Sequence, residues 1–90
     1  MMNVEVMFFG KLRETAGTSK EQASLEAGGK LSDLMSCLEK THGAKFAEEV
    51  RGIKGLRILI NGREYQVLDG VETVLKEKDS VVLLPPIEGG

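Results

Sequence analysis

The sequence predicts an α+β fold in which a mixed sheet of four to five strands carries one main helix on one face. Residues 3–9 alternate in hydrophobicity with a period of two, which is typical of a strand. Residues 31–41 repeat apolar side chains at helical spacing. Residues 81–84 form an unbroken apolar run, which is typical of a strand in the centre of a sheet. A chain of 90 residues holds one core, so we expect a domain over residues 1–84 and an extended tail over residues 85–90.

The N-terminal part predicts a hairpin whose connection contains a helical turn. One face of the first strand is fully apolar and the other partly so, because Val4, Val6 and Phe8 alternate with Glu5, Met7 and Phe9. Residues 11–16 are short and charged and precede Gly17, a residue type that often ends helices in the left-handed conformation. Residues 20–26 alternate weakly, with Ala23 and Leu25 inward, which suits a charged edge strand.

The main helix is predicted over residues 31–41. Its apolar stripe recurs at positions i, i+3, i+4 and i+7, which are Leu31, Leu34, Met35 and Leu38. Gly43 stands where helices commonly end. A second apolar face continues over a short helical turn at Phe46, Ala47 and Val50.

The C-terminal half predicts three further strands. Residues 56–60 are aliphatic, and Asn61-Gly62 suits a type I′ turn, so residues 64–67 should return as a short antiparallel partner. An irregular stretch and a turn at residues 77–80 then lead into the last strand. A hairpin, a crossing helix and three more strands make the β-grasp arrangement, in which the first and last strands can lie side by side.

Composition excludes several classes of function. Twelve Lys and Arg oppose fourteen Asp and Glu, so the chain lacks the basic surface that nucleic acids require, and we expect no nucleic-acid partner. Its apolar runs fall far below the roughly 20 residues of a membrane helix, and its start does not resemble a signal peptide. We therefore expect a cytoplasmic protein without a membrane partner.

Internal chemistry is not expected either. The single Cys37 cannot supply an iron-sulfur or zinc site, and beside Leu34 and Leu38 it suits a small hydrophobic role. His42 has no second ligand nearby and favours the end of a helix as a cation, while Met7 is expected to fill the core. With no nucleophile and base in a motif and no phosphate loop, we expect no metal, no stably bound cofactor and no catalysis by the isolated chain.

The candidate functional group is the end of the chain, Pro85-Pro86-Ile87-Glu88-Gly89-Gly90. Prolines lack an N–H and restrain their neighbours to extended geometry, so the chain should leave the sheet as a stiff stalk. Gly89 and Gly90 carry no side chains and can enter a narrow channel. The Gly90 carboxylate is ionised at neutral pH and a poor electrophile, so a partner must activate it, for example as an acyl-adenylate made with ATP.

A partner surface is expected beside this tail. In the last strand Val81 and Leu83 point to one side and Val82 and Leu84 to the other, yet a single helix covers only one face. Exposed apolar patches on a sheet commonly mark a protein partner. We predict that the partner contacts Phe9, Leu59, Leu84, Pro85, Pro86, Ile87 and Glu88.

A set of motifs spread over nearly the whole chain carries a family resemblance. They are Phe8-Phe9, Leu12-Arg13-Glu14, Gly17, Asn61-Gly62, Asp79 before Val81-Val82, and the terminal Pro-Pro-x-x-Gly-Gly. With these motifs the chain resembles the MoaD family, the small subunit of molybdopterin synthase, within the larger group that includes the thiamine sulfur carrier ThiS. The resemblance implies a ubiquitin-like β-grasp fold. It also implies that a MoeB-like enzyme adenylates Gly90 with ATP, that a sulfur donor protein converts it to a thiocarboxylate, and that the tail enters a MoaE-like large subunit. Sulfur would then pass to the pterin precursor in molybdenum cofactor biosynthesis, in a catalytic pocket belonging to the partner.

Two alternatives stay open. Ubiquitin-like archaeal modifiers share these motifs, so the chain is alternatively a protein modifier conjugated through Gly90 to lysines. The second alternative is an interaction module that binds through its sheet face, and it would function without Gly89 and Gly90.

The subfamily is open as well. Tungsten-cofactor counterparts share the same motifs, and the chain departs from common family patterns at Gly29-Lys30 and Glu77-Lys78-Asp79.

Overall fold

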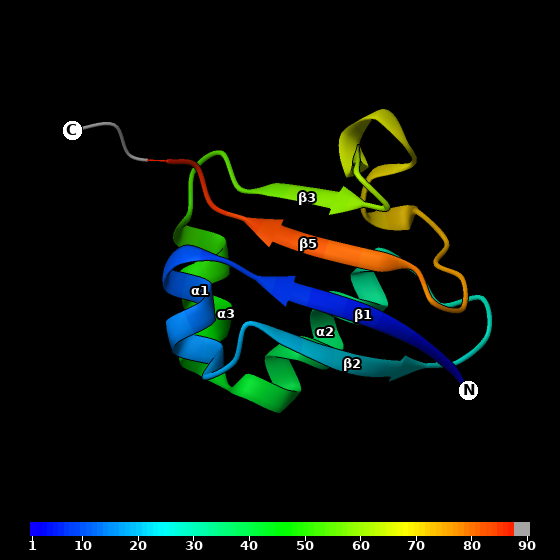
Figure 1. Cartoon of the computed structure of the whole chain (residues 1–90), viewed down its shortest axis with the longest axis horizontal. Coiled ribbons are helices and arrows are strands. Elements are labelled where there is room, and N and C mark those ends of the chain that lie inside the picture. Colours follow the sequence, from blue (N-terminus) through cyan, green and yellow to red (C-terminus); the bar gives the residue numbers. More distant parts are fainter. Residues whose placement is uncertain (88–90) are drawn as a thin grey trace.

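The computed structural model describes residues 1–87, and the centre of its sheet is a parallel pair of strands (Figure 1). The elements in chain order are β1 (Met2–Phe8), α1 (Gly10–Ala16), β2 (Lys20–Leu25), α2 (Leu31–His42), α3 (Ala44–Gly52), β3 (Arg57–Ile60), β4 (Arg63–Glu64), the 3₁₀ helices η1 (Tyr65–Val67) and η2 (Gly70–Glu72), and β5 (Ser80–Leu84). The strand order is β2-β1-β5-β3-β4. β1 and β5 are parallel, whereas β1 with β2, β3 with β5 and β3 with β4 are antiparallel. The predicted α+β fold with a mixed sheet is confirmed.

Alternate side chains of the central strands join the helices in one core. Val4, Val6 and Phe8 of β1 and Val81 and Leu83 of β5 are almost completely excluded from solvent. The helices add the buried residues Leu12, Leu31, Leu34, Leu38 and Phe46. Each such side chain contributes about 1.5–3 kcal/mol through its removal from water. Figure 1 shows α2 and α3 behind the sheet, so the opposite face is left without a covering helix in residues 1–87.

The helices are more extensive than the sequence pattern indicated. α2 lies close to the predicted range, but α1 and α3, expected as single turns, are helices of 7 and 9 residues. α1 ends at Gly17, whose φ of 77° is the left-handed value predicted for it. At the start of α2, the Asp33 carboxylate accepts a hydrogen bond from the backbone N–H of Lys30 at 2.8 Å. This bond caps the helix without the hydroxyl residue that is frequent there.

The prediction of a strand over residues 64–67 is wrong in most of its length. Arg63 and Glu64 pair with β3, but residues 65–67 form η1. The cause is tertiary, because Tyr65 and Leu68 turn back to pack against the core. The preceding turn is as predicted, since Asn61 and Gly62 both have positive φ, of 51° and 84°.

Asn61 also joins this turn to the turn that precedes β5. Its side-chain amide donates to Asp79 Oδ1 and its side-chain oxygen accepts from the backbone N–H of Ser80, both at 2.9 Å. Asp79 in turn accepts from the backbone N–H of Lys76 at 2.8 Å. The start of β5 is thereby held in register with the end of β3.

We expect Asn61→Ala to lower the free energy of unfolding by about 2 kcal/mol, because two hydrogen bonds are lost and alanine disfavours positive φ. Asn61→Gly removes the same bonds but keeps the backbone freedom, so its loss should be about 1 kcal/mol. Urea unfolding followed by circular dichroism measures both. Equal losses in the two variants would show that the left-handed backbone has no part in the effect.

Candidate functional site

An apolar patch lies on the sheet face opposite the helices. The strand register places Met7 of β1 beside Val82 of β5, and Val82 beside Leu59 of β3. Leu84 follows two residues later on the same face. Phe9 continues the alternation of β1, since its backbone is extended and its neighbour Phe8 is buried. We call these five residues, Met7, Phe9, Leu59, Val82 and Leu84, the outer patch.

The outer patch is partly exposed, while its inward neighbours are not. Phe9 is 38% exposed and the other four residues are half-buried, whereas Phe8 and Leu83 are at most 1% exposed. The structure thus brings together the three sheet residues of the predicted partner face, Phe9, Leu59 and Leu84. That a partner binds there stays a prediction.

Charged pairs border the outer patch on both sides. Next to Met7 in the sheet is Lys20, whose ammonium lies 3.6 Å from the Glu5 carboxylate. Next to Leu59 is Glu64, which accepts a hydrogen bond of 2.5 Å from Arg57 Nε. An apolar centre with a polar rim is the usual anatomy of a protein interface.

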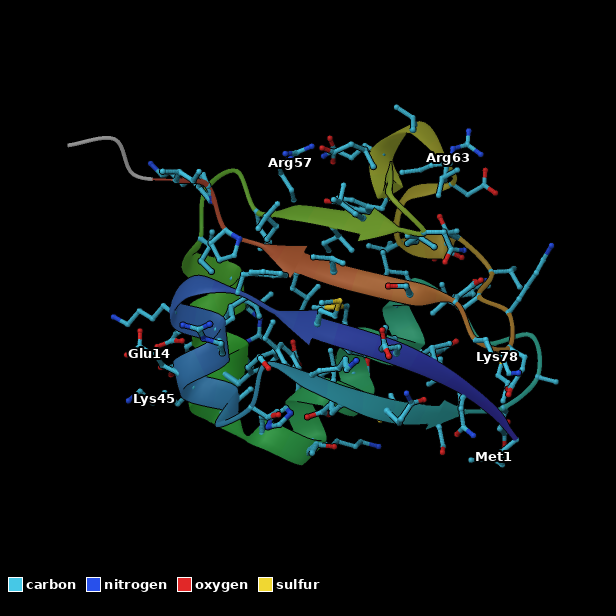
Figure 2. All side chains as sticks on the ribbon, in the orientation of Figure 1. Met1, Glu14, Lys45, Arg57, Arg63 and Lys78 are labelled. Carbon is cyan, nitrogen blue, oxygen red and sulfur yellow. The ribbon has the colours of Figure 1, made fainter. Side chains whose placement is uncertain are left out.

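The tail begins beside the outer patch. β1 and β5 are parallel, so Phe9 and Leu84 finish at the same end of the sheet, and Pro85 follows directly. Figure 2 shows Arg57, the register partner of Leu84, at the end of β3 nearest the tail. Pro85 is half-buried, Pro86 is exposed, and Ile87 is 96% exposed. The predicted site residues Glu88, Gly89 and Gly90 lie outside the described residues.

His42 and Cys37, the other residues considered for a chemical role, pack against structural neighbours. His42, expected only to suit the helix end, has a side chain that is 10% exposed, and its Nε2 lies 2.9 Å from Glu21 Oε1, which joins α2 to β2. Its ring centroid is 5.6 Å from that of Phe8. Cys37 is half-buried against the core. Across residues 1–87, three or more His, Cys, Asp or Glu side chains are nowhere arranged to hold a metal ion.

Sequence reasoning missed two members of the outer patch. Met7 was expected in the core, and Val82 was not chosen as a partner residue. The alternation of the strands could have indicated both, because Met7 lies two residues from Phe9 and Val82 two residues from Leu84, and residues two apart in a strand share a face.

In the described part of the chain, no helix has the length and apolar character needed to cross a membrane.

The strand order, the helices on one face and the terminal stalk define a β-grasp protein of the ubiquitin-like class. The profile of the ThiS family matches residues 6–90, and the chain belongs to this family. The predicted resemblance to the MoaD and ThiS group is therefore confirmed.

Three known proteins show the similarity over nearly all of the chain. The molybdopterin synthase sulfur carrier subunit of Drosophila erecta is 33% identical over 92 residues, covering 100% of this chain and 93% of that protein. Small archaeal modifier protein 1 of Methanosarcina acetivorans is 35% identical, with a TM-score of 0.75 and coverage of 100% and 98%. A Helicobacter pylori structure, a protein-protein complex of subunits 1 and 2 of molybdopterin-converting factor, contains a chain that is 28% identical, with a TM-score of 0.67 and coverage of 99% and 100%.

Leu83 and Leu84 are neighbours on β5 that face opposite sides of the sheet. Leu83→Ala should lower the free energy of unfolding by about 3 kcal/mol, because it leaves a cavity in the core. Leu84→Ala should cost about 1 kcal/mol or less, because solvent already reaches its side chain. Urea unfolding of the pair tests whether the outer patch is surface or core, and equal losses would identify it as core.

Proposed function

We propose that this chain is a sulfur carrier that works as the small subunit of a molybdopterin synthase, with the Gly90 carboxylate as its reacting group. The observation that carries the proposal is the continuity of the outer patch with the base of the tail at Leu84 and Pro85. One partner surface can bind the patch and receive the tail at the same time. Membership of the ThiS family and the similarity to a sulfur carrier subunit support this function.

The proposed chemistry begins with activation of the tail. A Gly90 carboxylate oxygen attacks the α-phosphorus of ATP, pyrophosphate leaves, and an acyl-adenylate forms. Hydrosulfide supplied by a donor protein then attacks the carbonyl carbon and displaces AMP, and loss of the sulfur-bound proton leaves a terminal thiocarboxylate. A MoeB-like activating enzyme would bind the ATP, so the carrier itself needs no resident cofactor. Positioning of the two reactants in the partner's pocket supplies much of the rate.

The thiocarboxylate then requires an acceptor site on a second subunit. The H. pylori complex joins two subunits of a molybdopterin-converting factor, and one of them is similar to this chain over its whole length. By analogy, the outer patch with Pro85, Pro86, Ile87 and Glu88 would bind a MoaE-like large subunit. Glu88 and Gly89 would carry the Gly90 thiocarboxylate into that subunit's pocket, where its sulfur passes to the pterin precursor.

Conjugation to proteins is the second candidate function. The similarity to a small archaeal modifier protein, at 35% identity, favours it specifically. Both functions pass through the same acyl-adenylate and diverge at the nucleophile, which is sulfur for the carrier and a lysine amine for the modifier.

Intact mass spectrometry distinguishes the two. With the activating enzyme, ATP and a sulfur donor, we expect the carrier's mass to rise by the difference between a sulfur and an oxygen atom, and we expect a variant lacking Gly90 to show no change. Protein isolated from native cells should show the same thiocarboxylate. Recovery of Gly90 only in isopeptide linkage to lysines would show that the chain is a protein modifier and not a sulfur carrier. Normal function of a variant without Gly89 and Gly90 would indicate the interaction module.

The outer patch gives a second prediction. Leu84→Glu places a carboxylate at the centre of the proposed interface, and we expect it to weaken binding of the large subunit by at least about 30-fold. Val74→Glu is the matched control, because Val74 is also partly exposed and also faces a basic residue, Lys30, as Leu84 faces Arg57. Isothermal titration calorimetry measures both. An equal effect of the two substitutions on the dissociation constant would show that the outer patch is not part of the interface.

A further inference from the structure

Two glycines border the proline pair at the base of the tail. Gly10 opens α1 with φ of 59°, and a β-carbon placed on it would lie 3.5 Å from Pro85 Cγ. Gly55, in the loop between α3 and β3, has φ of 75°, and a β-carbon there would lie 3.8 Å from Pro86 Cγ. Each proline ring therefore lies close to glycine backbone that carries no side chain.

Closeness to the tail distinguishes Gly10 and Gly55 from the other glycines with positive φ. Seven glycines in residues 1–87 have positive φ. For the remaining five, Gly17, Gly28, Gly43, Gly62 and Gly70, a β-carbon would have no neighbour within 4 Å. Backbone conformation alone thus favours glycine at those five positions, whereas at Gly10 and Gly55 a β-carbon would also come into ordinary van der Waals contact with a proline ring of the tail, and any larger side chain would add atoms beside that ring.

The two glycines lie on well-anchored segments. α1 is held by the fully buried Leu12 and by a hydrogen bond from the Thr15 hydroxyl to the Glu49 carboxylate of α3. The loop that carries Gly55 is packed against the core through Ile53 and Leu56. The proline rings also fix their own φ near −65°, so few torsions are left to set the direction of the stalk.

We propose that Gly10 and Gly55 are positioning residues that set the direction in which residues 85–87 leave the sheet. This inference rests on the proposed function, in which one partner binds the outer patch and the tail together. A carrier whose stalk points elsewhere must reorient before it binds. Its apparent dissociation constant therefore equals the intrinsic constant divided by the fraction of molecules whose stalk already points in the binding direction. Once bound, the tail is held by the partner's channel, so the rate of the chemical step is unchanged.

Asparagine is the appropriate substitution, because it adopts positive φ more readily than other residues and adds atoms beyond the β-carbon. The test variants are Gly10→Asn and Gly55→Asn. The chain supplies controls matched in φ, namely Gly70→Asn, at 61°, for Gly10 and Gly17→Asn, at 77°, for Gly55. Each control has a φ matched to its test position, but its β-carbon would have no neighbour within 4 Å.

The first readout is the orientation of the stalk in the isolated full-length protein. Residual dipolar couplings of the Ile87 N–H, measured by NMR in an aligned medium, should change in Gly10→Asn and Gly55→Asn. They should keep the wild-type values in both controls, and couplings within the sheet should be unchanged in all four variants. Wild-type Ile87 couplings in the two test variants would overturn the inference.

The second readout is adenylation by the activating enzyme, with the carrier as the varied substrate. Gly10→Asn and Gly55→Asn should raise KM about tenfold and change kcat by less than about twofold, while the controls alter neither. A fall in kcat with unchanged KM, or equal effects in the controls, would contradict positioning. If the wild-type chain is not adenylated at all, the proposed function fails, and the Ile87 couplings alone decide whether the glycines direct the stalk.

Discussion

The parallel pairing of β1 and β5 is the constraint on which the rest of the structure depends. It joins residues 5–8 to residues 80–83 across almost the full length of the chain. Such a pairing cannot form through a tight hairpin and depends on the intervening elements to close the loop. Because parallel strands finish at the same end of a sheet, the pairing also brings the beginning of α1 next to the place where the tail leaves.

The two faces of this central pair have different roles. Val6 and Val81 point into the core, where removal from water stabilises the fold. Met7 and Val82 are their neighbours in sequence, yet they point to the uncovered face. The two central strands, apolar on both faces, therefore give the domain both its buried core and a partly exposed apolar surface. In the proposed function, a partner covers that surface and accepts the tail beside it.

The base of the tail connects the core to the proposed chemistry. Pro85 and Pro86 lie beside Gly10 and Gly55, which belong to segments anchored by Leu12, Ile53 and Leu56. Preorganisation of this kind reduces the entropy that association loses, and it does so without adding a contact to the partner. In the proposed function, the domain would contribute to a partner's reaction in this way, by holding its reacting end in a defined direction.

Local patterns in the sequence determined the main helix, the turn at Asn61-Gly62, the alternation of β1 and the glycine end of α1, because each depends on residues close together in the chain. The tail was recognisable for the same reason, since Pro-Pro-x-x-Gly-Gly is a local motif. Tertiary structure decided what depends on distant segments. It turned Tyr65 back to the core where local propensity indicated a strand, and it placed Met7 beside Val82 and Leu59 on one face. It also brought Gly10 and Gly55 to the two prolines, a proximity set by the packing of α1 and the loop after α3, which no short-range pattern encodes.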